Sequence, residues 1–161
     1  MSQADIFLKL DTVPGESQDD KHKNELEIQS YSWGASNLGT ADIGGGNSAG
    51  KAQFQDFHFT VPLGKAADLL FLRCVSGDHI PKATLTQRKA GKTPQDALQI
   101  VFDNVMLTNV NIGNSTGAGL GTMQVSFNFE SYKIQAFEQC ADGTTKKCGN
   151  TGWNQKKGVK V

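Results

Sequence analysis

A glycine-rich run at residues 45–52 has part of the pattern of a phosphate-binding loop: Gly-Gly-Asn-Ser-Ala-Gly-Lys-Ala. In such a loop, a serine or threonine directly after the lysine holds magnesium. Here Ala52 follows Lys51. A phosphate-binding loop also opens a helix whose N-terminus meets the phosphate, whereas this run leads into a strand pattern, as does a second glycine-rich run at 117–121. The sequence therefore argues against nucleotide binding, and we expect no cofactor.

Three histidines are the other candidates for catalysis or metal binding. His22 lies in a charged segment, His58 lies among strand aromatics, and His79 lies beside the end of a predicted helix. No two of them have metal-ligand spacing, and no serine, cysteine or acid lies in a recognisable nucleophile turn. A triad can still assemble from residues far apart in the sequence. We nevertheless expect a protein that is not an enzyme and binds no metal.

The cysteines allow two interpretations. Cys74 falls within an apolar helical pattern and is expected to be a small buried side chain. Cys140 and Cys148 flank a turn-like stretch and could meet across a short loop. They are either two reduced thiols, as is usual in the cytosol, or a disulfide formed after export.

Composition and charge exclude several classes of protein. The 161 residues include 16 basic and 16 acidic side chains, so the basic excess of a nucleic-acid binder is missing. Lysines gather near the C-terminus, where a solvated, flexible tail at 138–161 explains them. No apolar run approaches the length of a membrane span, and the first residues do not have the pattern of a signal peptide. We expect a protein made in the cytoplasm, without membrane insertion, that leaves the cell, if at all, without an N-terminal signal.

The periodicity of apolar residues predicts a single, mostly β domain over residues 1–161. A helical pattern spans 65–76 and ends at Gly77. Strand patterns occupy 4–10, 25–34, 51–61, 82–89 and 123–130, with two strands or one long bent strand at 97–112. These elements make a barrel or sandwich with one helix. One helix leaves many strand edges unprotected, and a ring of identical subunits would cover them.

Changes of side-chain parity mark places where strands bend or contact other protein. In 25–34, Leu26 and Ile28 share one face, whereas Tyr31 and Trp33 share the other. Phe54 is out of step with the alternation that follows it, which predicts a bulge near residue 55. Residues 35–50 have no periodic pattern and are longer than an ordinary connection, which indicates a functional extended loop.

Several segments together resemble the haemolysin-coregulated protein (Hcp) family, the tube subunit of type VI secretion. In order, they are Gly15-Glu16-Ser17, Ser30-Tyr31-Ser32-Trp33-Gly34, Ala49-Gly50-Lys51, Phe57-His58-Phe59-Thr60, Ser76-Gly77-Asp78-His79-Ile80-Pro81-Lys82-Ala83-Thr84-Leu85, Arg88-Lys89-Ala90-Gly91 and Gly152-Trp153-Asn154. Each segment alone is unspecific, but their order and spacing cover nearly the whole chain.

The resemblance implies a two-sheet β-barrel with one flanking α-helix and a long extended loop. It also implies a homohexameric ring whose copies stack into a tube inside a contractile sheath. Sheath contraction would expel the tube, tipped by a spike protein, and secrete it with small effector proteins held in its lumen. On this resemblance the chain is a structural and carrier subunit, and its partners are itself, the sheath, the spike and the effectors.

The same resemblance implies roles for particular residues. Ser32 is expected to face the lumen and contact effectors, and its neighbours Ser30 and Ser36 are further candidates. The extended loop at 35–50 is expected to reach a neighbouring subunit or ring. Its contact residues would be Leu38, Asp42, Ile43, Gly44, Gly45 and Gly46.

Two alternative functions are compatible with the residues. The first is a ring or adaptor protein like a phage tail tube, which is never secreted. The second is a soluble β-barrel binding module or enzyme that shares these segments, for which a strictly monomeric state would be evidence.

Overall fold

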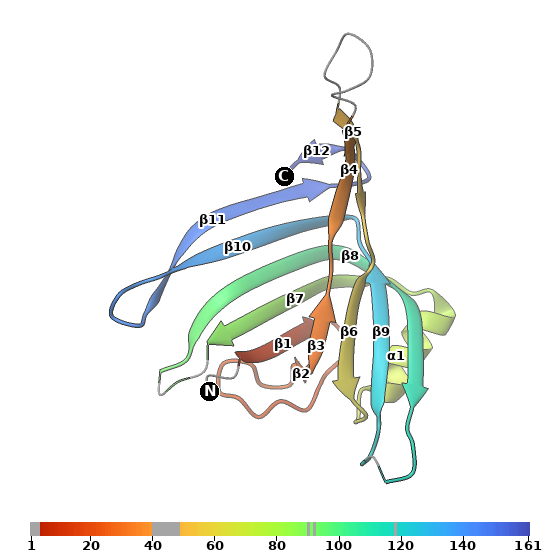
Figure 1. Cartoon of the computed structure of the whole chain (residues 1–161). Coiled ribbons are helices and arrows are strands. Elements are labelled where there is room, and N and C mark those ends of the chain that lie inside the picture. Colours follow the sequence, from red (N-terminus) through yellow and green to blue (C-terminus); the bar gives the residue numbers. More distant parts are fainter. Residues whose placement is uncertain (1–3, 40–48, 90, 92, 118) are drawn as a thin grey trace.

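The computed structural model describes residues 4–39, 49–89, 91, 93–117 and 119–161, and it consists mainly of two antiparallel sheets that share one strand (Figure 1). The large sheet has the order β12-β11-β10-β8-β7-β1-β2, and the small sheet has the order β8-β9-β6-β3. Strands β4 and β5 pair only with each other. The strands are β1 (Ala4–Leu10), β2 (Leu26–Glu27), β3 (Ser30–Ser32), β4 (Ala35–Gly39), β5 (Ala49–Phe54), β6 (Phe57–Pro62), β7 (Ile80–Lys89), β8 (Gln95–Gly113), β9 (Thr122–Asn128), β10 (Ser131–Gln139), β11 (Thr145–Asn154) and β12 (Val159–Lys160). This arrangement confirms the predicted mostly β, two-sheet class.

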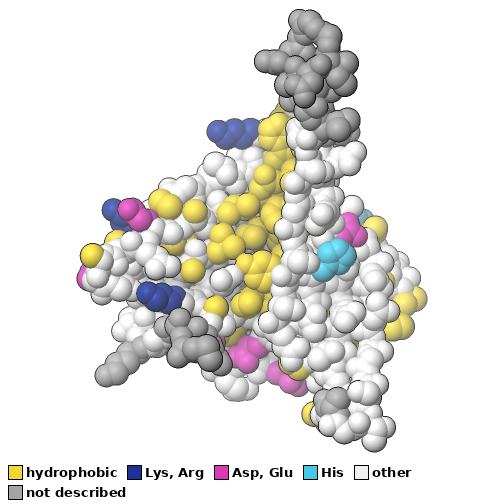
Figure 2. Space-filling model, in the orientation of Figure 1, with side chains coloured by type: hydrophobic (Ala, Val, Ile, Leu, Met, Phe, Trp, Pro, Cys, Tyr) yellow, Lys and Arg dark blue, Asp and Glu magenta, His cyan; other side chains and the backbone are white. Residues whose placement is uncertain are grey.

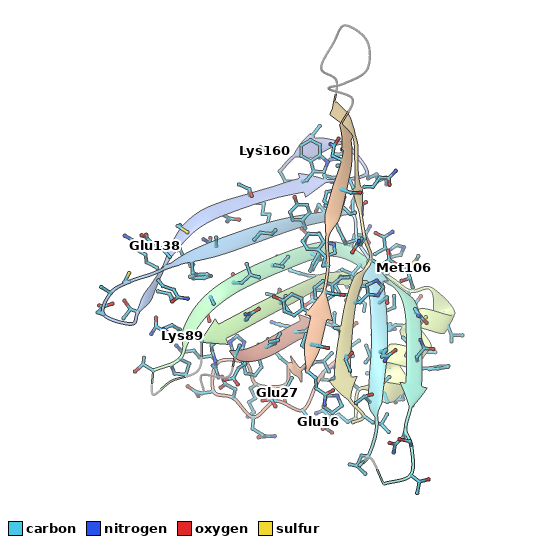
Figure 3. All side chains as sticks on the ribbon, in the orientation of Figure 1. Glu16, Glu27, Lys89, Met106, Glu138 and Lys160 are labelled. Atoms are coloured by element: carbon cyan, nitrogen blue, oxygen red, sulfur yellow. The ribbon has the colours of Figure 1, made fainter. Side chains whose placement is uncertain are left out.

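Strand β8 connects the two sheets because it bends in its middle. Its first part pairs with β7 and β10, and its last part pairs with β9 in the small sheet. The register against β9 shifts between Leu107 and Asn109, which is the irregularity expected of a β-bulge. Met106 lies at the point where the strand passes from one sheet to the other (Figure 3). Of the two predicted forms of 97–112, the single bent strand is therefore the one observed.

The changes of parity in the sequence mark crossings between the sheets. Residues 25–34, predicted as one strand, form β2 in the large sheet and β3 in the small sheet. Residues 51–61, predicted as one strand with a bulge, form β5 of the hairpin and β6 of the small sheet. The face of a strand that is buried depends on the sheet it joins, so the apolar parity changes when the chain changes sheets.

The segment predicted as a loop at 35–50 is partly a β-hairpin. β4 and β5 pair from Ala35–Phe54 to Gly39–Ala49, with an irregularity between Asn37 and Gly39. The hairpin projects from the end of the small sheet, away from the body of the molecule (Figure 1). The flanks of the predicted extended loop are therefore paired strands, which the sequence did not reveal because alternation is hard to recognise in so polar and glycine-rich a segment.

The core lies between the two sheets and is rich in phenylalanine. Phe57, Phe102 and Phe127 are fully buried, with ring centroids about 5 Å apart in each pair. Helix α1 (Ala67–Ser76) packs against β8 and buries Leu70. It ends at Gly77, whose φ of 73° is the left-handed conformation that glycine adopts without strain. The helix was predicted two residues longer at its start.

The C-terminal tail is part of the large sheet, which corrects the prediction of a flexible terminus. β11 pairs with β10 along its length, and β12 adds a short strand beyond it. The lysines at 146, 147, 156, 157 and 160 are exposed, as expected. Gly152 is buried because its Cα lies against the backbone of Tyr132, where a Cβ would collide with the carbonyl oxygen. Close backbone approach at this glycine fixes the tail in the sheet.

Candidate functional site: a polar sheet face beside an apolar strip

The outer face of the small sheet carries two rows of polar side chains, one residue from each strand. The backbone register places Ser32 opposite His58, His58 opposite Ser126, and Ser126 opposite Asn109. The second row, from the same register, is Ser30, Thr60, Gln124 and Asn111. Alternate residues of a strand point to opposite faces of the sheet. These rows therefore lie on the face of the small sheet opposite to its buried phenylalanines and valines.

The two rows line a shallow depression of about 260 Å³. Its lining includes hydroxyl, amide and imidazole groups, and no Asp, Glu, Lys or Arg. Figure 2 shows this face as a mostly uncharged column beside the hydrophobic surface of the large sheet. A surface of this kind offers hydrogen bonds to a passing molecule without a strong electrostatic field. We call these eight residues the polar face.

Within the polar face, His58 and Ser126 form a close pair. The Nδ1 atom of His58 lies 2.5 Å from the hydroxyl oxygen of Ser126. Ser126 is only 6% exposed, whereas His58 is exposed, so the imidazole covers the serine. A serine and a histidine at this distance are two members of a nucleophilic triad. Among the described residues, none of the ion pairs joins a carboxylate to His58. Asp56, two residues before His58, accepts a hydrogen bond from Thr108 Oγ1 at 2.8 Å.

The structure brings two of the three predicted lumen serines into the polar face. Ser30 and Ser32 are exposed on β3. Ser36 is also exposed, but it lies on the hairpin strand β4 opposite Gln53 and is outside the depression. Leu38 lies in β4, and the other predicted loop residues (Asp42, Ile43, Gly44, Gly45 and Gly46) lie outside the described residues.

Sequence reasoning did not identify six residues of the polar face: His58, Thr60, Asn109, Asn111, Gln124 and Ser126. The alternation of Phe57, Phe59 and Val61 on β6 and of the equivalent residues on β9 was the signal that could have found them. In a strand with one buried face, the residues between the apolar ones must point outward. The pairing of β6 with β9 and of β9 with β8 was the missing information.

Next to the polar face, the large sheet exposes part of its apolar face. The large sheet is wider than the small sheet, so the residues beyond the small sheet's edge are not fully covered (Figure 1). The half-buried apolar residues along this margin are Leu98, Ala136, Ile134, Tyr132, Trp33 and Phe54. Figure 2 shows a hydrophobic band along the same region. We call these residues the apolar strip. A continuous apolar band at the surface usually marks an interface with another protein.

Trp33 anchors the hairpin at one end of the apolar strip. Its ring packs edge-on against Phe102, Phe129 and Tyr132 at centroid distances of 5.1–5.6 Å. Its Nε1–H donates a hydrogen bond to the carbonyl oxygen of Gln55 at 3.0 Å. Trp33 precedes β4 and Gln55 follows β5. This bond and the bond from the Gln55 N–H to the carbonyl oxygen of Gly34, at 2.9 Å, together join the two ends of the hairpin. Trp33 therefore holds the base of the hairpin against the aromatic core.

The two sheets are also joined by a hydrogen bond beneath the polar face. Tyr31 donates from its hydroxyl to Oε1 of Gln87 on β7 at 2.6 Å. Burial raises the pKa of the Tyr31 phenol above its ordinary value, so the hydroxyl keeps its proton over the physiological pH range. Tyr31 lies between Ser30 and Ser32 on β3. The bond therefore holds in place the strand that carries both serines.

The cysteines do not form a bridge in the structure. Cys74, Cys140 and Cys148 are all free thiols. Cys140 lies at the β10–β11 turn, where its N–H bonds to the carbonyl oxygen of Thr144. Cys148 lies further along β11, beside the register shift opposite Ala136. The turn therefore does not place the two thiols opposite each other.

Two further classes of site are missing from the described part of the chain. Among those residues, no three His, Cys, Asp or Glu side chains gather where they could hold a metal ion. In the same ranges, no helix is long and apolar enough to cross a membrane.

Comparison with known proteins agrees with the fold and with the segments of the sequence. Residues 7–135 match the family model described as "Type VI secretion system effector, Hcp". The chain is 38% identical over 160 residues to protein hcp1 of Pseudomonas aeruginosa, covering 98% of each chain. It is similar to the crystal structure of Hcp1 from Salmonella typhimurium, with 30% identity, a TM-score of 0.78 and full coverage of both chains. A structure described as a type six secretion system protein has a TM-score of 0.93 at 26% identity and covers 99% of this chain and all of its own. The chain therefore belongs to the Hcp family of type VI secretion, a family of structural tube proteins and not of enzymes.

Proposed function

We propose that the chain forms a homohexameric ring in which the polar face lines the lumen, and that such rings stack into the expelled tube. The observation that carries this proposal is the absence of charged side chains among the residues lining the depression on the small sheet. A bore through which different proteins pass must neither repel them nor hold them by apolar contact. Hydroxyl and amide side chains meet both conditions.

The apolar strip supports contact between subunits of the ring. A monomer in water leaves this half-buried band of apolar and aromatic side chains exposed, and burying it stabilises an assembly by about 25 cal/mol per Å². In a closed ring, each copy presents one patch to the next copy in a head-to-tail manner. The strip lies directly beside the polar face, so a neighbour packed on the strip would extend the polar wall.

The hairpin supports a contact beyond the subunit's own body. An isolated two-stranded hairpin is only marginally stable in water, and β4–β5 pairs with no other strand in the described structure. Docking on a neighbouring subunit or ring would stabilise it. We therefore assign Leu38, Asp42, Ile43, Gly44, Gly45 and Gly46 to this contact.

Membership of the family supports the remaining proposed roles. The assembled tube is proposed to interact with the contractile sheath and the spike protein, to carry small effector proteins in its lumen, and to be secreted with them. Ser32 and Ser30 would contact the effectors, and Ser36 would face them from the base of the hairpin. A disulfide between Cys140 and Cys148 would require the β10–β11 turn to rearrange after export.

The test is the mass of the purified protein by light scattering, followed by electron microscopy of the same fraction. The expected result is a mass near six subunits together with ring-shaped particles. A protein that stays monomeric at high concentration would overturn the proposal and favour a binding module. Rings that never appear in the culture medium of the secreting bacterium would favour a tail-tube-like adaptor.

A further inference from the structure

Two titratable side chains line the depression, Tyr31 and His58. Burial raises the pKa of the Tyr31 phenol above its ordinary value, so Tyr31 stays neutral at physiological pH. The other members of the two rows carry hydroxyl or amide groups, which keep one charge state at all physiological pH values. Histidine changes its charge between pH 5 and 8. The charge of the residues that line the depression therefore depends on a single imidazole.

The contact with Ser126 fixes which ring nitrogen is free. Nδ1 faces the Ser126 hydroxyl, so Nε2, on the other side of the ring, is directed away from it. In the neutral ring, one nitrogen donates and the other accepts; in the protonated ring, both donate. The protonated ring can therefore donate from Nδ1 to the serine oxygen and from Nε2 to an external acceptor at the same time.

The surroundings of His58 leave its charge unpaired. From β3 it is faced by Ser30 and Ser32, from β9 by Gln124 and Ser126, and from β8 by Asn109 and Asn111. The half-buried carboxylate of Asp56, directly before β6, accepts a hydrogen bond from Thr108. None of the ion pairs formed by the described residues includes His58. An imidazolium here has no ion-pair partner among the described residues, and its Nε2–H can therefore donate to an external carboxylate.

We propose that His58 makes the polar face a pH-dependent site for carboxylate-bearing segments of cargo proteins. With a neutral imidazole the residues of the polar face carry no charge, and with a protonated imidazole they carry one positive charge per subunit. A carboxylate bound to Nε2–H stabilises the charged ring, so affinity for acidic segments rises as the pH falls. Affinity for basic segments falls over the same range. The inference rests on the proposed function for its biological setting, because a ring would repeat the imidazole around one level of the lumen.

The test measures peptide binding by fluorescence anisotropy at pH 5.5 and pH 8.0 in low salt. The probes are a labelled Glu-Gly-Ser repeat peptide and a Lys-Gly-Ser repeat peptide of equal length. Wild-type protein should bind the acidic peptide roughly tenfold more tightly at pH 5.5 than at pH 8.0, the gain of one charge-assisted hydrogen bond. His58→Gln keeps an amide on the face and should abolish the pH difference. His79→Gln, at another exposed histidine, should leave it unchanged.

An equal pH difference in wild type and His58→Gln would overturn the inference, as would its loss in His79→Gln. Light scattering on the same samples separates this outcome from failure of the proposed function. Rings without His58-dependent binding contradict the role of His58 alone. His58-dependent binding by a protein that never forms rings supports the site and contradicts the tube.

Discussion

Arg88 and Asp19 lie 69 residues apart in the sequence and form a two-pronged ion pair in the structure. Nη1 donates to Oδ1 at 3.0 Å and Nη2 to Oδ2 at 2.6 Å, and Nη2 also reaches Asp5 at 3.3 Å. The guanidinium lies 4.8 Å from the centroid of the Phe7 ring, against which His22 stacks. Asp19 and His22 belong to the long connection between β1 and β2. Arg88 thus clamps this connection onto the outer side of the large sheet.

Removing the guanidinium should destabilise the subunit through loss of this clamp. We expect Arg88→Ala to lower the free energy of unfolding by about 2–3 kcal/mol, because charge-assisted hydrogen bonds and the contact with Phe7 are lost together. The measurement is chemical denaturation followed by tryptophan fluorescence. Lys89→Ala, at the next residue and at the end of β7 (Figure 3), is the control and should change stability by less than about 0.5 kcal/mol. Equal stability of the two variants would show that the clamp is unimportant.

The same pair predicts a dependence of stability on acid. The side-chain hydrogen bonds from Arg88 lower the pKa of Asp19 from 3.8 to about 2. A carboxyl whose pKa is lower in the folded than in the unfolded state adds stability above the unfolded value, and this is lost as the pH falls through the folded value. Wild type should therefore lose part of its stability between about pH 4 and pH 2.

Asp19→Asn should remove that part of the pH dependence, since an amide has no proton to gain. Thermal unfolding measured from pH 2 to pH 6 checks this expectation. Asp20→Asn, at the exposed neighbouring carboxylate, is the matched control and should keep the wild-type profile. A wild-type profile in Asp19→Asn would contradict the assignment.

Two glycines of β11 test whether the tail is an integral strand of the large sheet. A Cβ at residue 152 would collide with the backbone carbonyl of Tyr132, whereas a Cβ at residue 149 meets nothing within 4 Å. We expect Gly152→Ala to destabilise the protein by about 1–3 kcal/mol, as overpacking does. Gly149→Ala should be nearly neutral. Denaturation curves of both variants decide the point, and a neutral Gly152→Ala would indicate that the tail detaches from the sheet at little cost.

Changes at Trp33 should affect both the stability of the subunit and its assembly. Its ring packs against aromatic residues of the core, and its Nε1–H bond to Gln55 helps to join the two ends of the hairpin. Trp33→Ala is expected to cost about 3 kcal/mol of stability. Trp33→Phe keeps an aromatic ring but loses the hydrogen bond to Gln55, and should fold with a misdirected hairpin. We expect this variant to form fewer or shorter stacks in electron microscopy. Normal stacks in Trp33→Phe would show that the hydrogen bond does not direct the hairpin.

Ile43, in the loop that the sequence analysis assigns to an inter-subunit contact, provides a separate test of contact between subunits. Ile43→Asp should reduce ring or stack formation, because a charge would be buried in the proposed contact. Asn47→Asp adds the same charge to the same segment at a residue outside the proposed contact and is the control. Sedimentation and electron microscopy measure the assembly, and unchanged assembly in Ile43→Asp would indicate that this residue faces solvent.

The local elements of this protein were largely determined by the sequence. The helix at 67–76, its end at Gly77 and the strands β1, β7 and β9 follow from periodicity and from glycine's tolerance of positive φ, which depend on neighbouring residues only. Charge balance and the ordered set of Hcp-like segments were also sufficient to identify the class of protein.

Only the tertiary structure decided which strands lie side by side. The polar face unites Ser32, His58, Asn109 and Ser126 from four strands, and the largest separation between paired residues among these, from His58 to Ser126, is 68 positions. The sequence contained both parity changes, at Trp33 and at Phe54. A β-bulge and a crossing between sheets produce the same change of parity, so the sequence pattern does not distinguish them. The polar tail likewise shows no strong alternation, and only its backbone hydrogen bonds with β10 in the structure reveal that it is a strand of the large sheet. The strands of the polar face, by contrast, meet across separations as large as the 68 residues between His58 and Ser126. Hydrogen bonds between such distant segments depend on the packing of the whole chain, and for that reason no local pattern could reveal them.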